Sequence, residues 1–252
     1  MRYTDGSPTR RRIGSSRSST RRPARSAWSA RSTKSRFHFW KLRLRATILL
    51  GPDEGTIRVI DEVTNFGAAP IGMELLYHIN LGEPLLTPGS RVHLAAKKIV
   101  PRNDHAATDV ATWHTVSGHC TKAEQVYFFE PLPDATGNAE ALLVDAAGKR
   151  AFGVAFPVKQ LPYFSLWKNP APSADGYVVG LEPGINFPNV RGFEEKRCRV
   201  KKLQPGETAR FELTLRAYDD PAHIARQVEG IAKRQATCPA ETLTAPWGAW
   251  CS

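Results

Sequence analysis

Apolar and polar residues alternate along most of the chain after the first 36 residues, with the period of two that half-buried β-strands have. In Trp40–Arg45 an apolar residue alternates strictly with a basic one, and Phe211, Leu213 and Leu215 alternate with polar neighbours near the other end. Thr56–Asn65 is rich in β-branched residues and leads into a turn signal. The pattern predicts an all-β protein.

Further short apolar runs, bounded by Gly and Pro, extend this pattern along the chain. They predict strands at Met73–Leu81, Arg91–Leu94, Gln125–Phe129, Ala141–Val144, Phe152–Val158, Tyr163–Trp167, Tyr177–Leu181, Cys198–Leu203 and Ala209–Ala217. Many short strands with almost no helix indicate a large antiparallel β-sandwich.

One segment near the C-terminus has a helical pattern instead. Asp220 is a favourable N-cap and Pro221 suits the first helical position. Ile224, Val228 and Ile231 recur on one face, which we interpret as core packing. We therefore expect a helix that ends near residue 235, followed by a tail, residues 237–252, whose pattern predicts no element.

Charge divides the chain into two unlike parts. Residues 1–45 hold 14 Lys and Arg and a single acid, Asp5, whereas residues 46–252 hold 21 basic and 23 acidic residues. The net charge of +11 therefore comes from the N-terminal arm, and the body is nearly neutral. The arm, residues 1–36, is rich in Arg and Ser and has no hydrophobic periodicity, so we expect it to be disordered.

Three interpretations of this arm stay open. A basic tail can neutralise the phosphates of nucleic acid, and an Arg-rich, acid-poor N-terminus is also the composition of an organelle transit peptide. The third is that the arm is GC-rich DNA translated out of frame, which we favour. Nucleic acid binding ranks well behind, because no aromatic residues are interleaved with the basic ones and no reader fold is recognisable.

The remaining composition points to a reduced, cytoplasmic protein. Cys120, Cys198, Cys238 and Cys251 are scattered and contain no C-x-x-C pair, which argues against a disulfide framework. No run of about 18 apolar residues exists, so we expect no membrane span. We divide the chain into the arm 1–36, a domain at 37–236 and the tail 237–252.

Two segments hold the residues that could carry chemistry. In Leu76–Gly82 (LYHINLG), His78 and Asn80 are two positions apart and so share one face of a strand. In Gly180–Pro188 (GLEPGINFP), Glu182 ends a strand beside a Pro/Gly turn. Spacing alone favours the plain alternatives, since a strand histidine is usually a hydrogen-bonded core residue and a glutamate before proline is usually exposed.

These two segments resemble the motifs of the aldose 1-epimerase (galactose mutarotase-like) family. The family carries a histidine in a strand ending roughly His-x-Tyr-Phe-Asn-Leu, and His78–Gly82 (HINLG) is similar with its aromatic positions lost. It also carries a late glutamate in Leu-Glu-Pro/Thr-Gln-x-Phe-Pro, to which Leu181–Pro188 is similar almost position by position. Residues 37–217 look closest to an uncharacterised bacterial branch, with further branch-like features at Lys98–Asn103, Glu124–Phe128 and Leu166–Lys168.

The resemblance implies that the chain binds a sugar and interconverts its α and β anomers. That reaction removes a proton from the C1 hydroxyl while donating one to the ring oxygen, after which the ring opens, the aldehyde rotates and the ring closes. By resemblance Glu182 is the base and His78 the acid, on opposite sides of the sugar. Such a pair is sufficient, because each group can both give and take a proton near neutral pH. No metal or organic cofactor is required, and we expect none.

Three further residues are candidates for contacts with the sugar. Asn80 shares the face of His78, and Glu124 falls roughly where the family places an acidic residue that binds sugar hydroxyls. Lys168 is a candidate for hydroxyls or an acidic group, although a snorkelling lysine is the plainer interpretation. The neighbouring Trp167 is a candidate for stacking on a sugar face, although most tryptophans are core residues.

A cluster of possible metal ligands carries less weight. His105, His114, His119 and Cys120 lie in a loop-like stretch, but their spacing matches no standard zinc pattern. We therefore predict no metal site.

One departure from the family matters for function. In the family, the first third of the fold supplies several strands, an arginine and another histidine that line the pocket, and here the Arg/Ser arm stands in their place. We therefore expect a sandwich that is incomplete at its N-terminus, with exposed edges. The alternative to an active epimerase is a non-catalytic sugar-binding module or an inactive truncated family member.

Overall fold

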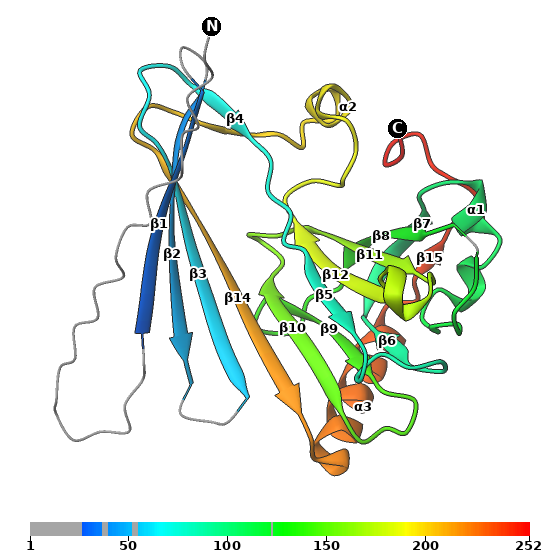
Figure 1. Ribbon diagram of the computed structural model, residues 1–252. Helices are drawn as coiled ribbons and strands as arrows, with labels where there is room; N and C mark the ends of the chain where they lie inside the picture. The colour runs from blue at the N-terminus through cyan, green and yellow to red at the C-terminus, as the bar shows by residue number, and fades with distance from the viewer. Residues whose placement is uncertain (1–26, 37–39, 52–54, 122) are drawn as a thin grey trace, which may run out of the picture.

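Two β-sheets packed face to face make up most of the computed structural model, which describes residues 27–36, 40–51, 55–121 and 123–252 (Figure 1). Within these residues the larger sheet has seven strands in the order β1-β2-β3-β14-β10-β9-β6, and the smaller has six in the order β15-β7-β8-β11-β12-β5. The pairings are antiparallel except that of β15 with β7. The predicted antiparallel sandwich is confirmed.

The bounds of the elements follow the predicted runs closely. The seven-stranded sheet contains β1 (Ala27–Arg36), β2 (Trp40–Leu50), β3 (Thr56–Asn65), β14 (Thr208–Tyr218), β10 (Ala151–Pro157), β9 (Asn138–Val144) and β6 (Arg91–His93). The six-stranded sheet contains β15 (Glu241–Thr242), β7 (Ala96–Pro101), β8 (Gln125–Pro131), β11 (Tyr163–Asn169), β12 (Val178–Gly184) and β5 (Ile79–Gly82). β13 (Lys201–Leu203) pairs with β4 (Ile71–Met73), and the helices are α1 (Asp104–Ala107), α2 (Arg191–Lys196) and α3 (Pro221–Thr237).

The core lies between the two sheets, where every second side chain of each strand points inward. Val154 and Phe156 of β10 are buried against Phe164 of β11, and the rings of Phe156 and Phe164 lie nearly parallel, 6.1 Å apart. Because side chains alternate along a strand, the residues between these, such as Ser165 and Trp167, face away from the core. The six-stranded sheet therefore offers a second face.

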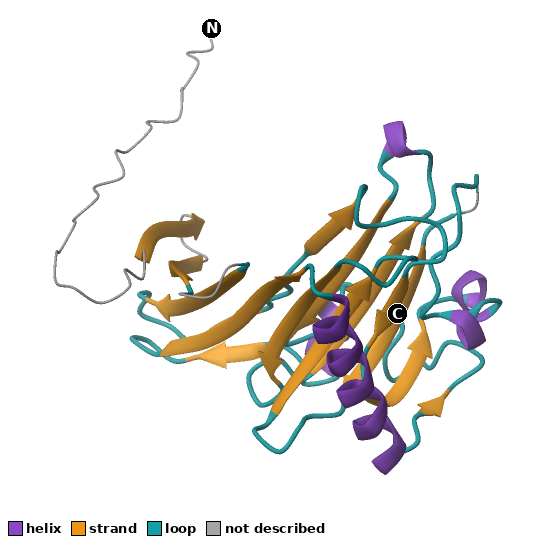
Figure 2. Cartoon of the chain, turned by 90° about the horizontal axis from the view of Figure 1, so that it is seen from below, coloured by secondary structure: helices purple, strands orange, loops and turns teal. Residues whose placement is uncertain are grey.

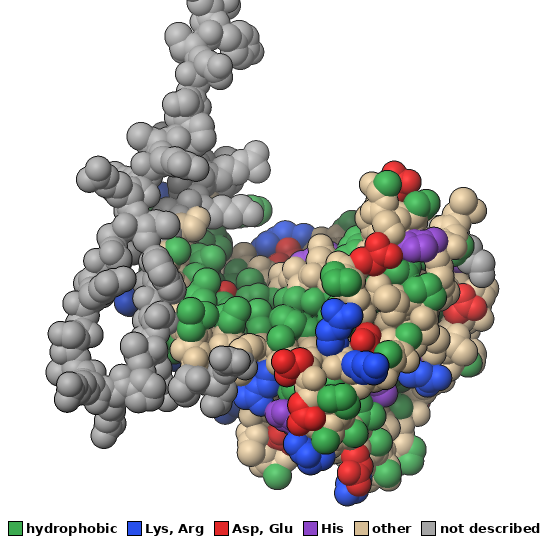
Figure 3. All heavy atoms as spheres, turned by 60° about the horizontal axis from the view of Figure 1, so that its bottom comes forward, with side chains coloured by type: hydrophobic (Ala, Val, Ile, Leu, Met, Phe, Trp, Pro, Cys, Tyr) green, Lys and Arg blue, Asp and Glu red, His purple; other side chains and the backbone are tan. Residues whose placement is uncertain are grey.

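Part of the seven-stranded sheet extends beyond the other layer. In Figure 1, β1, β2 and β3 lie on the side away from the six-stranded sheet. Trp40, Leu42 and Leu44 of β2 are accordingly only half-buried, and Ile48 and Leu50 are 40% and 39% exposed. Figure 3 shows hydrophobic side chains gathered on the surface beside the residues drawn in grey, whereas charges of both signs are spread over the rest of that view.

The structure corrects the predicted end of the disordered arm. Strand β1 lies inside the segment 1–36 and pairs with β2 in an unbroken register, from Ala27 with Leu49 to Arg36 with Trp40. An edge strand of this kind is held by backbone hydrogen bonds, which need no alternation of apolar and polar residues. Residues 1–26 and the predicted boundary at residue 37 lie outside the described residues.

Two other details differ from the sequence-based expectation. The run predicted as one strand, Met73–Leu81, is divided between β4 and β5, because the chain leaves one pairing at Met73 and joins the six-stranded sheet only at Ile79. β7 was not predicted as a strand, since Lys97 and Lys98 interrupt its apolar pattern. The short helices α1 and α2 were not predicted either.

Helix α3 matches its sequence signals. The Asp220 side chain accepts a hydrogen bond from the backbone N–H of Ala222, and Ile224 and Ile231 are buried against Leu142 and Tyr218. Figure 2 shows α3 lying across one sheet, with the layers of the sandwich seen from below. Within the described part of the chain, no helix combines the length and the hydropathy that crossing a membrane requires.

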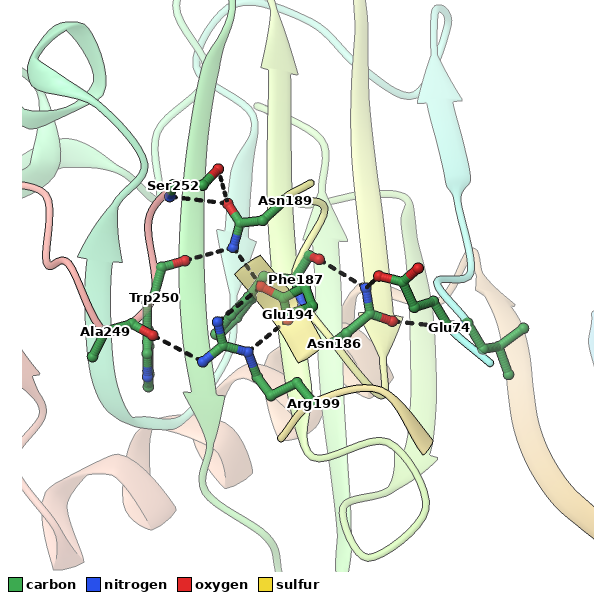
Figure 4. A network of polar contacts seen from close by, with 10 residues as sticks. Glu74, Asn186, Phe187, Asn189, Glu194, Arg199, Ala249, Trp250 and Ser252 are labelled. Carbon is green, nitrogen blue, oxygen red and sulfur yellow. Dashed lines mark hydrogen bonds and ion pairs between the residues drawn. The ribbon is translucent and has the colours of Figure 1, made fainter. Parts of the chain in front are cut away.

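A buried ion pair joins the segment after β12 to the C-terminal tail (Figure 4). The guanidinium of Arg199 donates to both carboxylate oxygens of Glu194, at 2.6 and 2.8 Å, and both residues are nearly inaccessible to solvent. Glu194 also accepts from the Phe187 N–H and the Asn189 amide, while Arg199 donates to the carbonyl of Ala249. Each charge is thus both paired and hydrogen-bonded, as a buried ion pair requires.

This network fastens the tail to the outward face of the six-stranded sheet. Trp250 is buried against Phe187 and the side chains of Val126 and Phe128 on β8. Leu243 continues the pairing of β15 by donating its N–H to the Ile99 carbonyl. The segment 237–252, for which the sequence predicts no element, is therefore part of the sandwich.

Replacing Arg199 with Met should loosen this fastening. Glu194 would stay buried without its partner, which typically costs about 3–5 kcal/mol of the free energy of unfolding. We expect that loss in chemical denaturation, together with faster amide hydrogen exchange in residues 241–252. The matched control is Arg197→Met, which removes an exposed donor to the carbonyl of Gly248. Equal losses in the two variants would contradict the assigned role of the buried pair.

Candidate functional site

The outward face of the six-stranded sheet arranges its side chains in two rows that run across the strands. In one row, Glu182 of β12 stands beside Ser165 of β11, and Ser165 beside Phe128 of β8. In the next row, Gly180 stands between Trp167 of β11 and Asn80 of β5. Residues paired in register lie on the same face, so the hydrogen-bond ladder alone brings these side chains together.

His78 and Glu182, the predicted acid and base, are in contact. Nε2 of His78 lies 3.0 Å from Oε1 of Glu182, although the ring N–H is not aimed at that oxygen and no hydrogen bond forms. The glutamate side chain is only 4% exposed, whereas the histidine is 48% exposed. The structure therefore brings the pair together. The resemblance implies a sugar with the two groups on its opposite sides, and a 3.0 Å contact leaves no room for a sugar between them.

The environment of Glu182 favours its protonated form. The pKa of this carboxyl is raised from 4.5 to about 7, mainly by burial and then by the charge of Glu124, while the charge of Arg102 opposes both. A carboxylate whose pKa lies near neutrality exchanges protons readily in both directions, which general acid–base catalysis needs. Oε1 is buried and accepts no hydrogen bond, which is uncommon for a buried polar atom.

Gly180 makes the space that the Glu182 carboxyl occupies. A Cβ built on Gly180 would lie 2.5 Å from Oε1 of Glu182 and 3.3 Å from both the His78 and the Trp167 rings. The carboxyl thus leans over the glycine, between the imidazole and the indole. A side chain at this position would displace it.

Trp167 and Glu124 form the next part of the site. The indole lies edge to face with the His78 ring, with the ring centroids 5.4 Å apart. Its Nε1–H donates to Oε2 of Glu124 at 2.7 Å. Glu124 is exposed and close enough to act on the Glu182 carboxyl, so the structure places this candidate at the site.

Arg102 joins the site without having been predicted. It follows β7, and its N–H donates to the carbonyl of Val126, so the ladder continues to it. Arg102 therefore stands at the far end of the row that contains Val126, Trp167 and Gly180. Its segment was noted in the sequence as a branch-like feature, but only the register shows which face the arginine is on.

Three contacts hold the segment before His78 against the segment after Glu182. The Tyr77 N–H donates to the Pro183 carbonyl, and the Ile185 N–H donates to the Leu75 carbonyl, both at 3.0 Å. The Leu75 N–H in turn donates to the side chain of Asn186, which is buried. Asn186, part of the predicted glutamate motif, thus helps to hold the segment of His78 against the segment of Glu182.

Lys168 is a correction, because it lies on the opposite face of β11 from Trp167. Its Nζ donates to the carbonyls of Trp113 and Thr115, and it lies 5.1 Å from the centre of the Tyr127 ring. Burial lowers the pKa of Lys168 to about 8. It holds a loop on the core side of the sheet, so it is not placed to bind a ligand at Glu182.

The remaining candidate residues are Asn80 and the possible metal ligands. Asn80 is exposed on the face of His78, as expected from their spacing. His105 contacts the Ala123 carbonyl and His119 the Ala171 carbonyl, and among the described residues no three His, Cys, Asp or Glu side chains converge as metal ligands.

A cavity of about 690 Å³ lies elsewhere, over the outer face of the seven-stranded sheet. It is lined by β14 and α3 side chains, including Arg216, Tyr218 and Arg234, and contains none of the residues around Glu182. We place the candidate site at Glu182, because the convergence of a buried carboxylate, an imidazole and an indole is more specific chemistry than volume.

Comparison with known proteins shows what the chain as a whole is similar to. The family model of the domain of unknown function DUF4432 matches residues 11–217. The chain is 32% identical to a "putative aldose 1-epimerase" from Klebsiella pneumoniae, with a TM-score of 0.86, over 89% of this chain and 59% of that one. It therefore spans about three-fifths of the length of that relative. No curated protein matches.

Two more distant structures show the fold alone. A protein of the same description from Escherichia coli K12 is 16% identical, with a TM-score of 0.54, over 76% of this chain and 65% of that one. A galactose mutarotase-like protein from Lactobacillus casei is 14% identical, also with a TM-score of 0.54, over 77% and 70%. The fold is galactose mutarotase-like.

The buried carboxyl should make stability depend on pH. Between pH 4.5 and 7 the folded protein holds the Glu182 proton more tightly than the unfolded chain does, so the free energy of unfolding should fall as pH rises through this window. The loss is on the order of 3 kcal/mol. Glu182→Gln should remove most of this loss in denaturation measured at pH 5 and pH 8. Glu130→Gln, at a surface glutamate paired with Lys97, is the control and should keep this loss, and an unchanged loss in Glu182→Gln would contradict the assignment.

Proposed function

Because the chain belongs to the family of the domain of unknown function DUF4432, and has the galactose mutarotase-like fold, we propose that it binds an aldose and interconverts its α and β anomers. The observation that carries the proposal is the contact between the exposed imidazole of His78 and the buried carboxyl of Glu182. The raised pKa of Glu182 supports it.

The contact between the two groups suits the reaction from one side of the sugar. The C1 hydroxyl and the ring oxygen are both bonded to C1, so an acid and a base that touch each other can each reach one of them. Glu182 takes the proton of the C1 hydroxyl as the C1–ring oxygen bond breaks, and protonated His78 gives its proton to the ring oxygen. After rotation about C1–C2, closure on the other face reverses both transfers.

The neighbouring side chains would hold the sugar. Trp167 offers an aromatic edge beside the glycine, and Asn80 and Glu124 offer polar groups on either side of it. A proton transfer of this kind needs no redox or metal cofactor. Each role here rests on one bound sugar lying over Gly180.

The alternative is a sugar-binding module without catalysis. It is favoured by the openness of the site, since the 690 Å³ cavity lies on the other sheet and His78 is half-exposed. Such a module would use the same floor of Gly180 and Trp167. The two functions differ only in whether proton transfer occurs.

Removing the base should abolish anomer exchange and spare binding. Glu182→Gln keeps the shape of the side chain, and general base catalysis typically contributes about 10²–10⁴-fold. We expect such a loss in polarimetry of freshly dissolved aldoses, with sugar binding by calorimetric titration largely kept. His78→Ala should lose rate as well. Glu130→Gln, at a surface glutamate paired with Lys97, should be unchanged. Binding by the parent protein without any exchange would favour the module.

Gly180→Ala tests the geometry of the site while His78 and Glu182 themselves stay unchanged. The added methyl group would push the Glu182 carboxyl aside, so we expect exchange to fall roughly 10²-fold. Gly192→Ala is the matched control, because no atom lies within 4 Å of its added Cβ. Normal activity in Gly180→Ala would show that the carboxyl is not needed where it lies.

A further inference from the structure

We propose that the sugar that binds at Glu182 carries an anionic group, a carboxylate or a phosphate, and that Arg102 binds this group. The inference rests on the proposed function for the position of the sugar, but it concerns a different residue and a different end of the ligand. A specificity residue of this kind would distinguish acidic aldoses from neutral ones.

The position of Arg102 suits the end of the ligand remote from C1. Arg102, Val126, Trp167 and Gly180 follow one another across β7, β8, β11 and β12. With strands about 4.8 Å apart, the Cα atoms of Arg102 and Gly180 are separated by roughly 14 Å. A sugar that reacts over Gly180 and lies along Trp167 therefore presents its far substituent toward Arg102.

Arg102 differs from the other cations of this face in having no partner. Arg199 is paired with Glu194, and Lys98 lies 2.9 Å from Glu241. Among the described residues the half-buried guanidinium of Arg102 makes no hydrogen bond and no ion pair. Its planar fork of donors matches a carboxylate or a phosphate, which makes arginine the usual residue for such groups.

Arg102 does not serve to neutralise Glu182. The two form no ion pair, and burial together with Glu124 raises the pKa of Glu182 to about 7 in spite of the arginine. The guanidinium is nevertheless close enough for its charge to act on that carboxyl. The end of the site opposite the acid–base pair is thus positively charged and unpaired.

The tail covers part of the outward face near β7 and β8, so Arg102 is the group that a ligand would meet at that end of the face. Val126 and Phe128 belong to one buried cluster with Trp250 of the tail, and the thiol of Cys251 contacts the Pro101 carbonyl beside Arg102. Polar contacts at this end therefore come from the guanidinium and from Glu124, whose Oε2 already accepts from Trp167. A neutral sugar would leave the arginine unused.

The experiment compares anomer exchange of matched neutral and anionic aldoses. Exchange NMR would be run with glucose, glucose 6-phosphate and glucuronate, and with the corresponding galactose series, on the full chain. We expect kcat/KM to be roughly tenfold or more higher for at least one anionic form. Comparison of the sugar phosphates with glucuronate and galacturonate tells which anion is bound. If the sugar phosphates are preferred, inorganic phosphate should inhibit competitively, and if the carboxylates are preferred, acetate should.

Arg102→Met should remove this preference. We expect kcat/KM for the anionic aldose to fall roughly tenfold or more relative to kcat/KM for the neutral sugar, mainly through KM. Arg102→Lys keeps the charge but loses the fork, so it should fall between the two. Lys97→Met, at an exposed cation of β7, the strand that Arg102 follows, is the control.

The outcomes separate this inference from the proposed function. Two results would overturn the inference and leave the proposed epimerase function standing. One is equal kcat/KM for neutral and anionic sugars. The other is that each Arg102 variant changes kcat/KM equally for the neutral and the anionic sugars. Absence of exchange with every sugar, but tighter binding of anionic sugars that Arg102→Met abolishes, would overturn the epimerase and uphold the inference. If Arg102→Met fails to fold, Arg102→Lys decides by the same criteria.

Discussion

The register of β12 between β11 and β5 is the constraint on which the candidate site depends. Leu181 faces inward and is fully buried, and this fixes Gly180 and Glu182 on the outward face. A slip of one residue would turn the glutamate into the core and the leucine out of it, which the buried apolar area opposes. The same ladder sets Trp167 beside Gly180, and Asn80 on the other side.

The outward face of the six-stranded sheet is suited to be the candidate site because the C-terminal tail covers part of it. The tail covers the β7 and β8 end with Trp250, while the β11, β12 and β5 end stays open. A carboxyl at the boundary between these regions is largely removed from water, which raises its pKa, yet its neighbour His78 remains accessible. The proposed acid–base function depends on both conditions, since desolvation raises the pKa of the carboxyl and the exposed imidazole can be reached by a ligand.

The ion pair of Glu194 and Arg199 links this arrangement to parts of the chain that are far apart in sequence. It binds the loop after β12, through Phe187 and Asn189, and the tail, through Ala249. The cover over the sheet and the strand that carries Glu182 are therefore held by one network (Figure 4). Since both charges are buried, the network has little freedom to rearrange.

The sequence by itself determined most of the strands, the helix α3 and the two motifs with His78 and Glu182, because a period of two, an N-cap with proline and a short motif are local properties. It did not determine β1 and β7, in which apolar and polar residues do not alternate. It also placed Asn80 on the face of His78. It could not place Lys168, because the spacing of residues shows which side chains share a face of a strand but not which face points to the core. The side chain of Lys168 lies on the core side of the sheet. It missed Arg102, Gly180 and the tail, whose roles arise from pairing between strands distant in sequence. The contact between His78 and Glu182, 104 residues apart, exists only because β5 and β12 are neighbours in one sheet, and that pairing is a property of the tertiary structure.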